Sequence, residues 1–268
     1  MTSLALLEQQ CSALGLDGRH VVFHSSGRSL GELEGGIDGL LSVLVRRLAT
    51  VIAPGFTFAS TIHPPDGDHP PQNGFDYGRR WISPSTPFEA RTASIDPRMG
   101  ILPRRLFARP EARRSTHPWH SWIAAGEAAD EITAPHPWDW PHRPLEEVEK
   151  RDGLVALVGT GLDTCTALHL SEQRAGRHPF IRWAVDAGGT TRRVRVGGCG
   201  NGFRALDADL LPLFRTGKLG EADVWVAPLR PLLDAGTRCF IEKPLATLCQ
   251  PSCIKCLDGA AGGPPDSA

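Results

Sequence analysis

The sequence has almost no net charge and no long hydrophobic run, and both absences exclude classes of protein. Its 268 residues carry 29 Lys and Arg against 30 Asp and Glu, a formal net charge of −1 at pH 7. This balance gives no overall field for binding nucleic acid or an anionic membrane. No stretch approaches the roughly eighteen consecutive apolar residues of a membrane-spanning helix. The N-terminus, MTSLALLEQQ, lacks the basic start of a signal peptide, so we expect a cytoplasmic protein.

An even set of cysteines is also lacking, which argues against a disulfide framework in a chain without a leader. Three of the seven cysteines lie close together, in Cys249-Gln-Pro-Ser-Cys253-Ile-Lys-Cys256. Zinc prefers four tetrahedral thiolate or imidazole ligands, often with one pair two residues apart. We therefore expect a structural zinc held by Cys199, Cys249, Cys253 and Cys256. Reduced cysteines without metal are the alternative, and Cys239 is a rival fourth ligand.

Hydrophobic periodicity predicts an α/β fold. Residues 20–24 read as a buried strand, 35 to about 47 as a helix, and 49–53 as a second strand. This order predicts parallel strands covered by helices. Later segments predict a strand at 121–125, an antiparallel hairpin within 180–196 and a helix at 207–215.

We expect one domain over residues 1–258, with a central mixed sheet and helices on both faces. The small hairpin and a cysteine-rich C-terminal lobe would complete it, with the zinc-stapled lobe lying within 199–258. Residues 259–268 have the composition of a disordered tail. Residues 55–98 are rich in proline and polar residues with little periodicity; a substrate lid and a flexible insertion are the two interpretations.

The segment from Leu154 to Glu172 carries the strongest indication of chemistry. An apolar run, LVALV, meets a Gly-containing turn, and we expect a helix to begin behind Asp163 or Thr164. Thr166, His169 and Glu172 recur every three residues and so share one helix face. Strand ends that run into helix starts are common catalytic positions in α/β folds. His169 is thus placed as a general base with Glu172 to orient it, although a solvated face would have the same spacing.

Several motifs occur together and in order along the chain. They are His24-Ser25-Ser26, Arg28-Ser29-Leu30-Gly31, Gly35-Gly36, Pro54-Gly55-Phe56-Thr57-Phe58, Arg114-Ser115-Thr116-His117-Pro118 and Thr166-Ala-Leu-His169-Leu-Ser-Glu172. With them the chain resembles the aminoglycoside N3-acetyltransferases of the antibiotic N-acetyltransferase family, from about residue 5 to 260. Some members of that family carry a similar set of cysteines.

The resemblance implies an acyltransferase and assigns roles to particular residues. The donor would be acetyl-CoA, the acceptor the 3-amino group of a 2-deoxystreptamine aminoglycoside, and the outcome antibiotic resistance. His169 would be the base, held by Glu172, and Thr166 the hydroxyl near the thioester oxygen. The residues implied to lie along acetyl-CoA are Ser25, Ser26, Arg28, Ser115 and His117.

The chemistry of direct transfer suits these residue types. An aminoglycoside amine is largely protonated at neutral pH and cannot attack a thioester until its proton leaves, which an imidazole can accept. A hydroxyl or loop amide can then stabilise the oxyanion. Cys165 could in principle form an acetyl-enzyme, but the family pattern has Asn there, and we favour a structural role.

The sequence also departs from the family where the acceptor would bind. Arg104 and Arg105 stand where the family usually has an acidic residue, although a polycationic acceptor calls for carboxylates. The long loop offers only a few, namely Asp66, Asp68, Asp76 and Glu89. Two alternatives follow: an acetyltransferase for another, natural-product amine, and a non-catalytic protein that binds an acyl-CoA or an amine. We expect no nucleic-acid or membrane partner, and the sequence leaves monomer and homodimer open.

Overall fold

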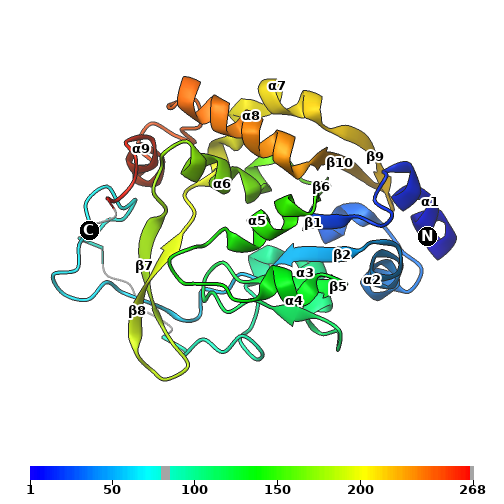
Figure 1. Ribbon diagram of the computed structural model, residues 1–268, viewed down its shortest axis with the longest axis horizontal. Helices are drawn as coiled ribbons and strands as arrows, with labels where there is room; N and C mark the ends of the chain where they lie inside the picture. Colours follow the sequence, from blue (N-terminus) through cyan, green and yellow to red (C-terminus); the bar gives the residue numbers. More distant parts are fainter. Residues whose placement is uncertain (80–84, 266–268) are drawn as a thin grey trace.

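A seven-stranded mixed sheet runs through the middle of the molecule (Figure 1). The computed structural model describes residues 1–79 and 85–265, and the following statements concern those residues. The sheet order is β4-β5-β2-β1-β6-β10-β9. These strands are β1 (His20–Ser25), β2 (Thr50–Pro54), β4 (Arg113–Arg114), β5 (Trp122–Gly126), β6 (Leu154–Val158), β9 (Arg215–Leu219) and β10 (Ala222–Pro228).

The centre of the sheet is parallel and its margins are antiparallel. β1 pairs in parallel with both β2 and β6, whereas the remaining pairings are antiparallel. β2 and β6 are buried along their whole length, as continuous apolar runs are when helices cover both faces of a sheet. The parallel pairing brings the carboxyl ends of β1 and β6 together, with Ser25 opposite Val158.

Helices cover both faces of this sheet, as predicted. Alternate strand residues enter two separate cores, with Val22 and Leu157 on one side and Phe23 and Ala156 on the other. One core includes α1 (Leu4–Ala13), α2 (Gly36–Arg47) and α3 (Ile101–Phe107). The other includes α4 (Ala129–Thr133), α5 (Arg143–Lys150), α6 (Ala167–Arg174) and α8 (Leu229–Glu242).

A second, smaller sheet extends from one side of the molecule (Figure 1). It consists of β3 (Thr61–Ile62), β7 (Phe180–Val185) and β8 (Thr191–Val196) in that order, all antiparallel. The hairpin prediction is therefore confirmed. β3 belongs to the long loop 55–98, and Asp68 of that loop forms an ion pair with Arg193 of β8. The loop is thus attached to the hairpin through both backbone and side chains.

The C-terminal third differs from the prediction. A helix was expected at 207–215, but α7 (Asp207–Leu210) is short and a 3₁₀ turn follows it. β9, β10 and α8 were not predicted. In α8 Pro231 lies in the first turn, where its missing N–H removes no helix hydrogen bond, so proline is no sign of a break there.

The prediction of a disordered tail from residue 259 is wrong for the part that the structure describes, up to residue 265. Helix α9 (Ile254–Ala260) includes the first two residues of that part. The carbonyl of Gly262 accepts from the His178 amide, and the Gly263 amide donates to the Asp258 carbonyl. These bonds tie the end of the chain to the turn before β7. Residues 266–268 lie outside the described residues.

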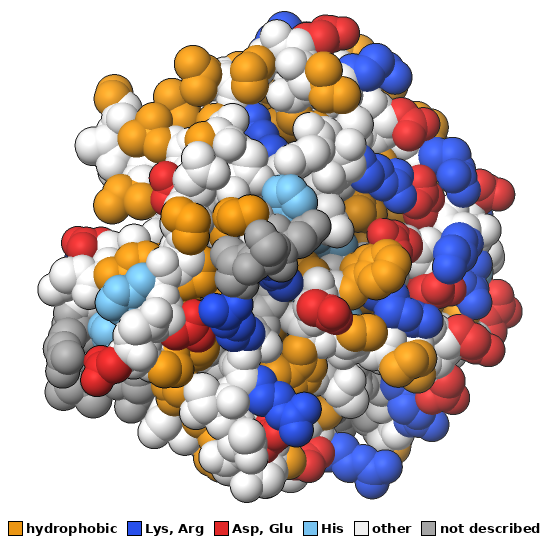
Figure 2. Space-filling model, turned by 60° about the vertical axis from the view of Figure 1, so that its left-hand side comes forward, with side chains coloured by type: hydrophobic (Ala, Val, Ile, Leu, Met, Phe, Trp, Pro, Cys, Tyr) orange, Lys and Arg blue, Asp and Glu red, His pale blue; other side chains and the backbone are white. Residues whose placement is uncertain are grey.

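The face shown in Figure 2 agrees with the balanced composition. In Figure 2 acidic and basic side chains are interspersed over the right-hand part of the face shown, without a field of one sign there. In the described part of the chain, no helix combines the length and apolar character needed to cross a membrane.

Candidate active site

The central strand–helix unit forms as predicted, with one change at the helix start. After β6 a 3₁₀ turn, Leu162–Thr164, precedes α6, and Thr166 is the residue before its first turn. The N-cap expected at Asp163 or Thr164 is therefore wrong, because the 3₁₀ turn delays the helix. The shift leaves Thr166, His169 and Glu172 at the start and along one side of α6.

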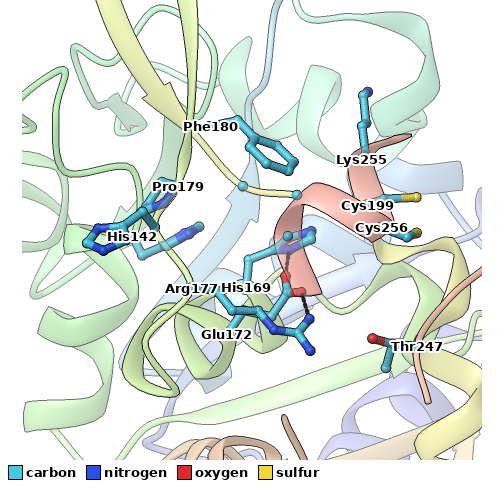
Figure 3. Close-up of a pocket in the computed structure, with 14 residues that line it drawn as sticks. His142, His169, Glu172, Arg177, Pro179, Phe180, Cys199, Thr247, Lys255 and Cys256 are labelled. Atoms are coloured by element: carbon cyan, nitrogen blue, oxygen red, sulfur yellow. Dashed lines mark hydrogen bonds and ion pairs between the residues drawn. The ribbon is translucent and has the colours of Figure 1, made fainter. Parts of the chain in front are cut away.

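His169 and Glu172 form a tightly bonded pair, which we call the dyad (Figure 3). Nδ1 of His169 lies 2.6 Å from Oε2 of Glu172. The two side chains are only 11% and 12% exposed, so they do not lie on a solvated helix face. Because Nδ1–H donates to the carboxylate, the lone pair of Nε2 is left to accept a proton, as in a histidine general base.

Arg177, which follows the end of α6, holds the other oxygen of Glu172, and no sequence pattern predicted this contact. Its guanidinium donates to Oε1 of Glu172 at 2.7 Å and to the carbonyl of Pro244 at 2.7 Å. The same guanidinium lies over the Phe240 ring, 4.7 Å from its centroid. Both oxygens of Glu172 are therefore bonded. Helical spacing could not predict this contact, because α6 ends at Arg174 and Arg177 reaches back from the turn.

A cavity of about 200 Å³ lies at the carboxyl ends of β1 and β6. Ser25 and Thr166, two residues expected near the donor, both line it. Ser26 and Arg28 follow in the 3₁₀ segment Gly27–Leu30 and its cap, with Arg28 exposed beside this region of the fold. This arrangement is suited to a long ligand that enters over the β1 turn. The cavity also borders His24, whose buried Nε2 has no hydrogen-bond partner among the described residues.

Ser115 and His117 do not line that cavity. Both are fully buried, and their polar atoms are already used. The Ser115 hydroxyl accepts from the Trp122 amide and bonds Nδ1 of His136. His117 bonds the Arg195 carbonyl through Nε2 and accepts backbone amides at Nδ1. The structure thus places both residues in the packing between β5 and the hairpin rather than at a ligand surface.

Cys165 is buried and lines neither the dyad's cavity nor the cavity beside Ser25. Its side chain is buried at 1% exposure, and burial raises the pKa of its thiol to about 12. A thiol in that state holds its proton at neutral pH and is a poor nucleophile. Its position favours the structural role.

The four expected metal ligands converge. The sulfur atoms of Cys199, Cys249, Cys253 and Cys256 all lie within 4.8 Å of one another. Cys239 is not part of this group and lies buried in α8. We refer to the four as the cysteine cluster. It lies beside the dyad, because Cys199 and Cys256 line the same small cavity as His169 and Glu172 (Figure 3).

An open cleft of about 480 Å³ lies on the hairpin side of the dyad. It adjoins the dyad's cavity at Gly197 and Gly198, which line both. Three cations line it, Arg98, Arg182 and Lys255, and none of the described lining residues is acidic. The loop carboxylates singled out in the sequence line none of the cavities described here; they are Asp66, Asp68, Asp76 and Glu89.

Comparisons with known proteins show the family to which the chain belongs. The sequence profile of the family described as aminoglycoside 3-N-acetyltransferase matches residues 22–241. The chain belongs to that family. It is 34% identical over 181 residues to aminoglycoside N(3)-acetyltransferase IX of Micromonospora chalcea, covering 63% of this chain and 61% of the relative. It is 33% identical over 181 residues to aminoglycoside N(3)-acetyltransferase VII of Streptomyces paromomycinus, covering 63% and 59%. The alignments thus span about three fifths of these relatives.

The fold also matches that of a solved acetyltransferase. The apoenzyme of aminoglycoside acetyltransferase AAC(3)-IVa superimposes with a TM-score of 0.77 at 26% identity, covering 97% of both chains. A mutant of the same enzyme in complex with a gentamicin matches with a TM-score of 0.74 at 25% identity, again covering 97% of both chains. The mixed sheet and its helices are therefore those of this acetyltransferase family.

Proposed function

We propose that the chain transfers the acetyl group of acetyl-CoA to the 3-amino group of a 2-deoxystreptamine aminoglycoside and so confers resistance. The observation that carries this proposal is the dyad: His169 is bonded to Glu172 at 2.6 Å. The proposed donor cavity lies at the start of α6, and the open cleft adjoins the dyad's own cavity at Gly197 and Gly198. The family to which the chain belongs and its similarity to an enzyme solved with a gentamicin support the choice of acceptor. Acetyl-CoA and free thiols are both typical of the reducing cell interior, where we place the reaction.

Each of these residues has its own role in the proposed reaction. Nε2 of His169 accepts a proton from the acceptor ammonium or the attacking amine, and Glu172 stabilises the imidazolium. The amine nitrogen forms a bond to the acetyl carbon, and the Thr166 hydroxyl donates to the developing oxyanion. The C–S bond then breaks, and the thiolate of CoA takes up the proton that the new amide nitrogen loses. When the acceptor starts as an ammonium, its first proton passes from the His169 imidazolium to solvent. Ser25, Ser26 and Arg28 would hold the pantetheine and phosphates, and no acetyl-enzyme is needed.

Release of free CoA from acetyl-CoA tests the proposal. Purified protein is mixed with acetyl-CoA and, in turn, gentamicin, apramycin and a simple amine, and product NMR locates the acetyl group. Aminoglycoside-dependent release with the acetyl group on N3 is the expected result. The absence of release with every amine would contradict acetyl transfer and leave a binding protein, which would retain acetyl-CoA affinity.

The cations of the cleft favour a second candidate, an acetyltransferase for a different amine. Arg98, Arg182 and Lys255 would repel a polycation. Arg98 is paired with Asp96. Arg182 is 4% exposed, and within the described part of the chain it is hydrogen-bonded to carbonyl and amide oxygens and to no carboxylate. CoA release with a less cationic amine and none with gentamicin or apramycin would favour this candidate.

We also propose that the cysteine cluster holds a structural zinc ion. Four sulfur atoms within 4.8 Å of one another fit a closed tetrahedral thiolate site, which leaves no position for substrate. Metal analysis of dialysed protein should find about one zinc per chain, lost in Cys256→Ser and retained in Cys239→Ser. Equal zinc in both variants, or none in the wild type, would contradict the assignment.

A further inference from the structure

The backbone at Gly197 and Gly198 lies directly against the dyad. A Cβ atom at Gly197 would lie 2.9 Å from Cγ and 3.0 Å from Cδ2 of His169, closer than carbon atoms normally approach. At Gly198 a Cβ would lie 3.5 Å from Oε2 of Glu172, an ordinary contact. Residue 197 therefore has to be glycine if the His169 ring is to keep its place, and the two glycines form a wall over the dyad.

This wall has no side chains of its own to fix it, so its position depends on its two ends. At one end Val196 pairs with Phe180 in the β7–β8 hairpin. At the other end the next residue is Cys199, a member of the cysteine cluster, with its sulfur 3.8 Å from that of Cys249. Without an anchor at Cys199, a two-glycine segment would have wide conformational freedom.

The Glu172 side of the dyad is also connected to the cysteine-rich C-terminal lobe. Arg177, which holds Glu172, also donates to the carbonyl of Pro244, shortly before Cys249. The segments after Cys199 and before Cys249 are pressed together, because a Cβ at Gly202 would lie only 2.0 Å from the Thr247 carbonyl oxygen. Thr247 itself lines the dyad's cavity (Figure 3).

We infer that Gly197 and Cys199 are positioning residues for the acetyl transfer proposed above. The cysteine cluster, when it holds metal, fixes the Gly197–Gly198 wall and through it the orientation of the His169 ring. The cluster is thus part of the support of the base and does more than attach the C-terminal lobe. A displacement of the base by about 1 Å is enough to cost roughly 10²-fold in rate.

The first experiment compares glycine variants of the zinc-loaded protein. Gly197→Ala should lower kcat by roughly 10²-fold with little change in the KM for acetyl-CoA, and Gly198→Ala should lower it less. Gly188→Ala, in the exposed turn between β7 and β8, is the matched control and should behave as wild type. Wild-type kcat in Gly197→Ala would overturn the inference.

The second experiment removes the metal and observes the ring directly. In protein labelled with ¹⁵N-histidine, the His169 imidazole resonances are identified by their absence in His169→Ala. Chelation of zinc should shift them while those of His136 stay, and added zinc chloride should restore them together with kcat. This readout does not need turnover, so it separates the inference from the proposed acceptor and reaction.

Two results of that experiment would overturn the metal's role. One is His169 resonances that do not move on complete metal removal, and the other is a wild-type protein that contains no zinc. Far-UV circular dichroism is recorded on the same samples. If the metal-free protein has unfolded, the zinc-loaded Cys199→His variant is measured in its place. Its imidazole can still bind zinc, but the backbone of residue 199 is then attached to the metal through a longer side chain. Unshifted His169 resonances in that variant would also contradict the inference.

Discussion

His169 on α6 and the histidines of the 117–142 segment are neighbours whose rings have different surroundings. The rings of His142 and His169 are nearly parallel, with centroids 6.3 Å apart, and the centroid of His120 lies 5.9 Å from that of His142. His117, His120, His136 and His142 are buried, and burial lowers the pKa of His120 and of His136 to about 3. His169 instead has a carboxylate at 2.6 Å.

This difference shows what makes one histidine of the group suitable as a base. Removal from water disfavours the protonated ring, and none of the four buried rings is hydrogen-bonded to a carboxylate in the described structure. Such rings stay neutral and serve as packing and as hydrogen-bond partners. A ring that donates to an ionised carboxylate can take up a proton during the reaction, because the carboxylate stabilises the resulting cation.

The largest expected effect comes from removing the carboxylate partner of His169, so that its ring, like those of the buried histidines, has no carboxylate beside it. Glu172→Gln keeps the shape but removes the charge, and its amide can donate to Nδ1 and so select the wrong tautomer. We expect kcat to fall by roughly 10²–10⁴-fold, measured by CoA release. Glu146→Gln, on α5, is the control and should keep wild-type kcat; equal activity of both variants would show that the carboxylate is dispensable.

A substitution among the buried histidines should lower the stability of the fold and leave kcat unchanged. His136 bonds the Ser115 hydroxyl and the carbonyls of Trp140 and Pro141. His136→Ala should lower the free energy of unfolding by roughly 2–4 kcal/mol, because it leaves a cavity and unpaired polar groups. Urea unfolding measures the loss. A large fall in kcat of the folded protein, without loss of stability, would contradict the division of roles.

The buried histidines should also make the fold sensitive to acid. Burial lowers the pKa of His120 and His136 from 6.5 to about 3, and that of His24 to about 4. Between these values and 6.5 the unfolded chain binds protons that the folded chain does not, so stability falls as pH falls through this window. Each histidine should contribute about 1.4 kcal/mol per pH unit well below its unfolded pKa. Urea midpoints at about pH 7.5 and about pH 5.5 measure this, and equal midpoints would contradict it.

The smallest expected effect concerns Ser115, which the resemblance placed beside acetyl-CoA. Its hydroxyl accepts from the Trp122 amide inside the protein. Ser115→Ala should therefore lower the free energy of unfolding by about 1 kcal/mol and leave the KM for acetyl-CoA unchanged. A rise in that KM several-fold above wild type, in a protein of unchanged stability, would restore the ligand role.

Local patterns predicted the parts of the molecule that depend on local spacing. The strands and helix of residues 20–54, the hairpin and the β6–α6 unit follow from periodicity, and three-residue spacing placed His169 and Glu172 together. β10 and α8 were missed, although β10 alternates buried and exposed residues at its start. Pro228 and Pro231 are close together where β10 ends and α8 begins, and prolines at that spacing are also typical of a loop.

Contacts between distant segments could not be read from spacing. Arg177 reaches Glu172 only because α6 ends three residues earlier, and Pro244 is brought to it by the packing of α8 on α6. The burial of Ser115 and His117 depends on the hairpin, whose Arg195 carbonyl bonds the His117 ring. The sequence grouped the cysteines, but only the fold places them beside the dyad.

The central claim is that His169 is the base, and His169→Ala tests it most directly. CoA release with the best acceptor and CoA affinity by calorimetry are measured on the same sample. We expect release to fall by roughly 10²–10⁴-fold, CoA affinity to stay at the wild-type value, and added imidazole to restore part of the rate. Wild-type release in His169→Ala would show that another group removes the proton.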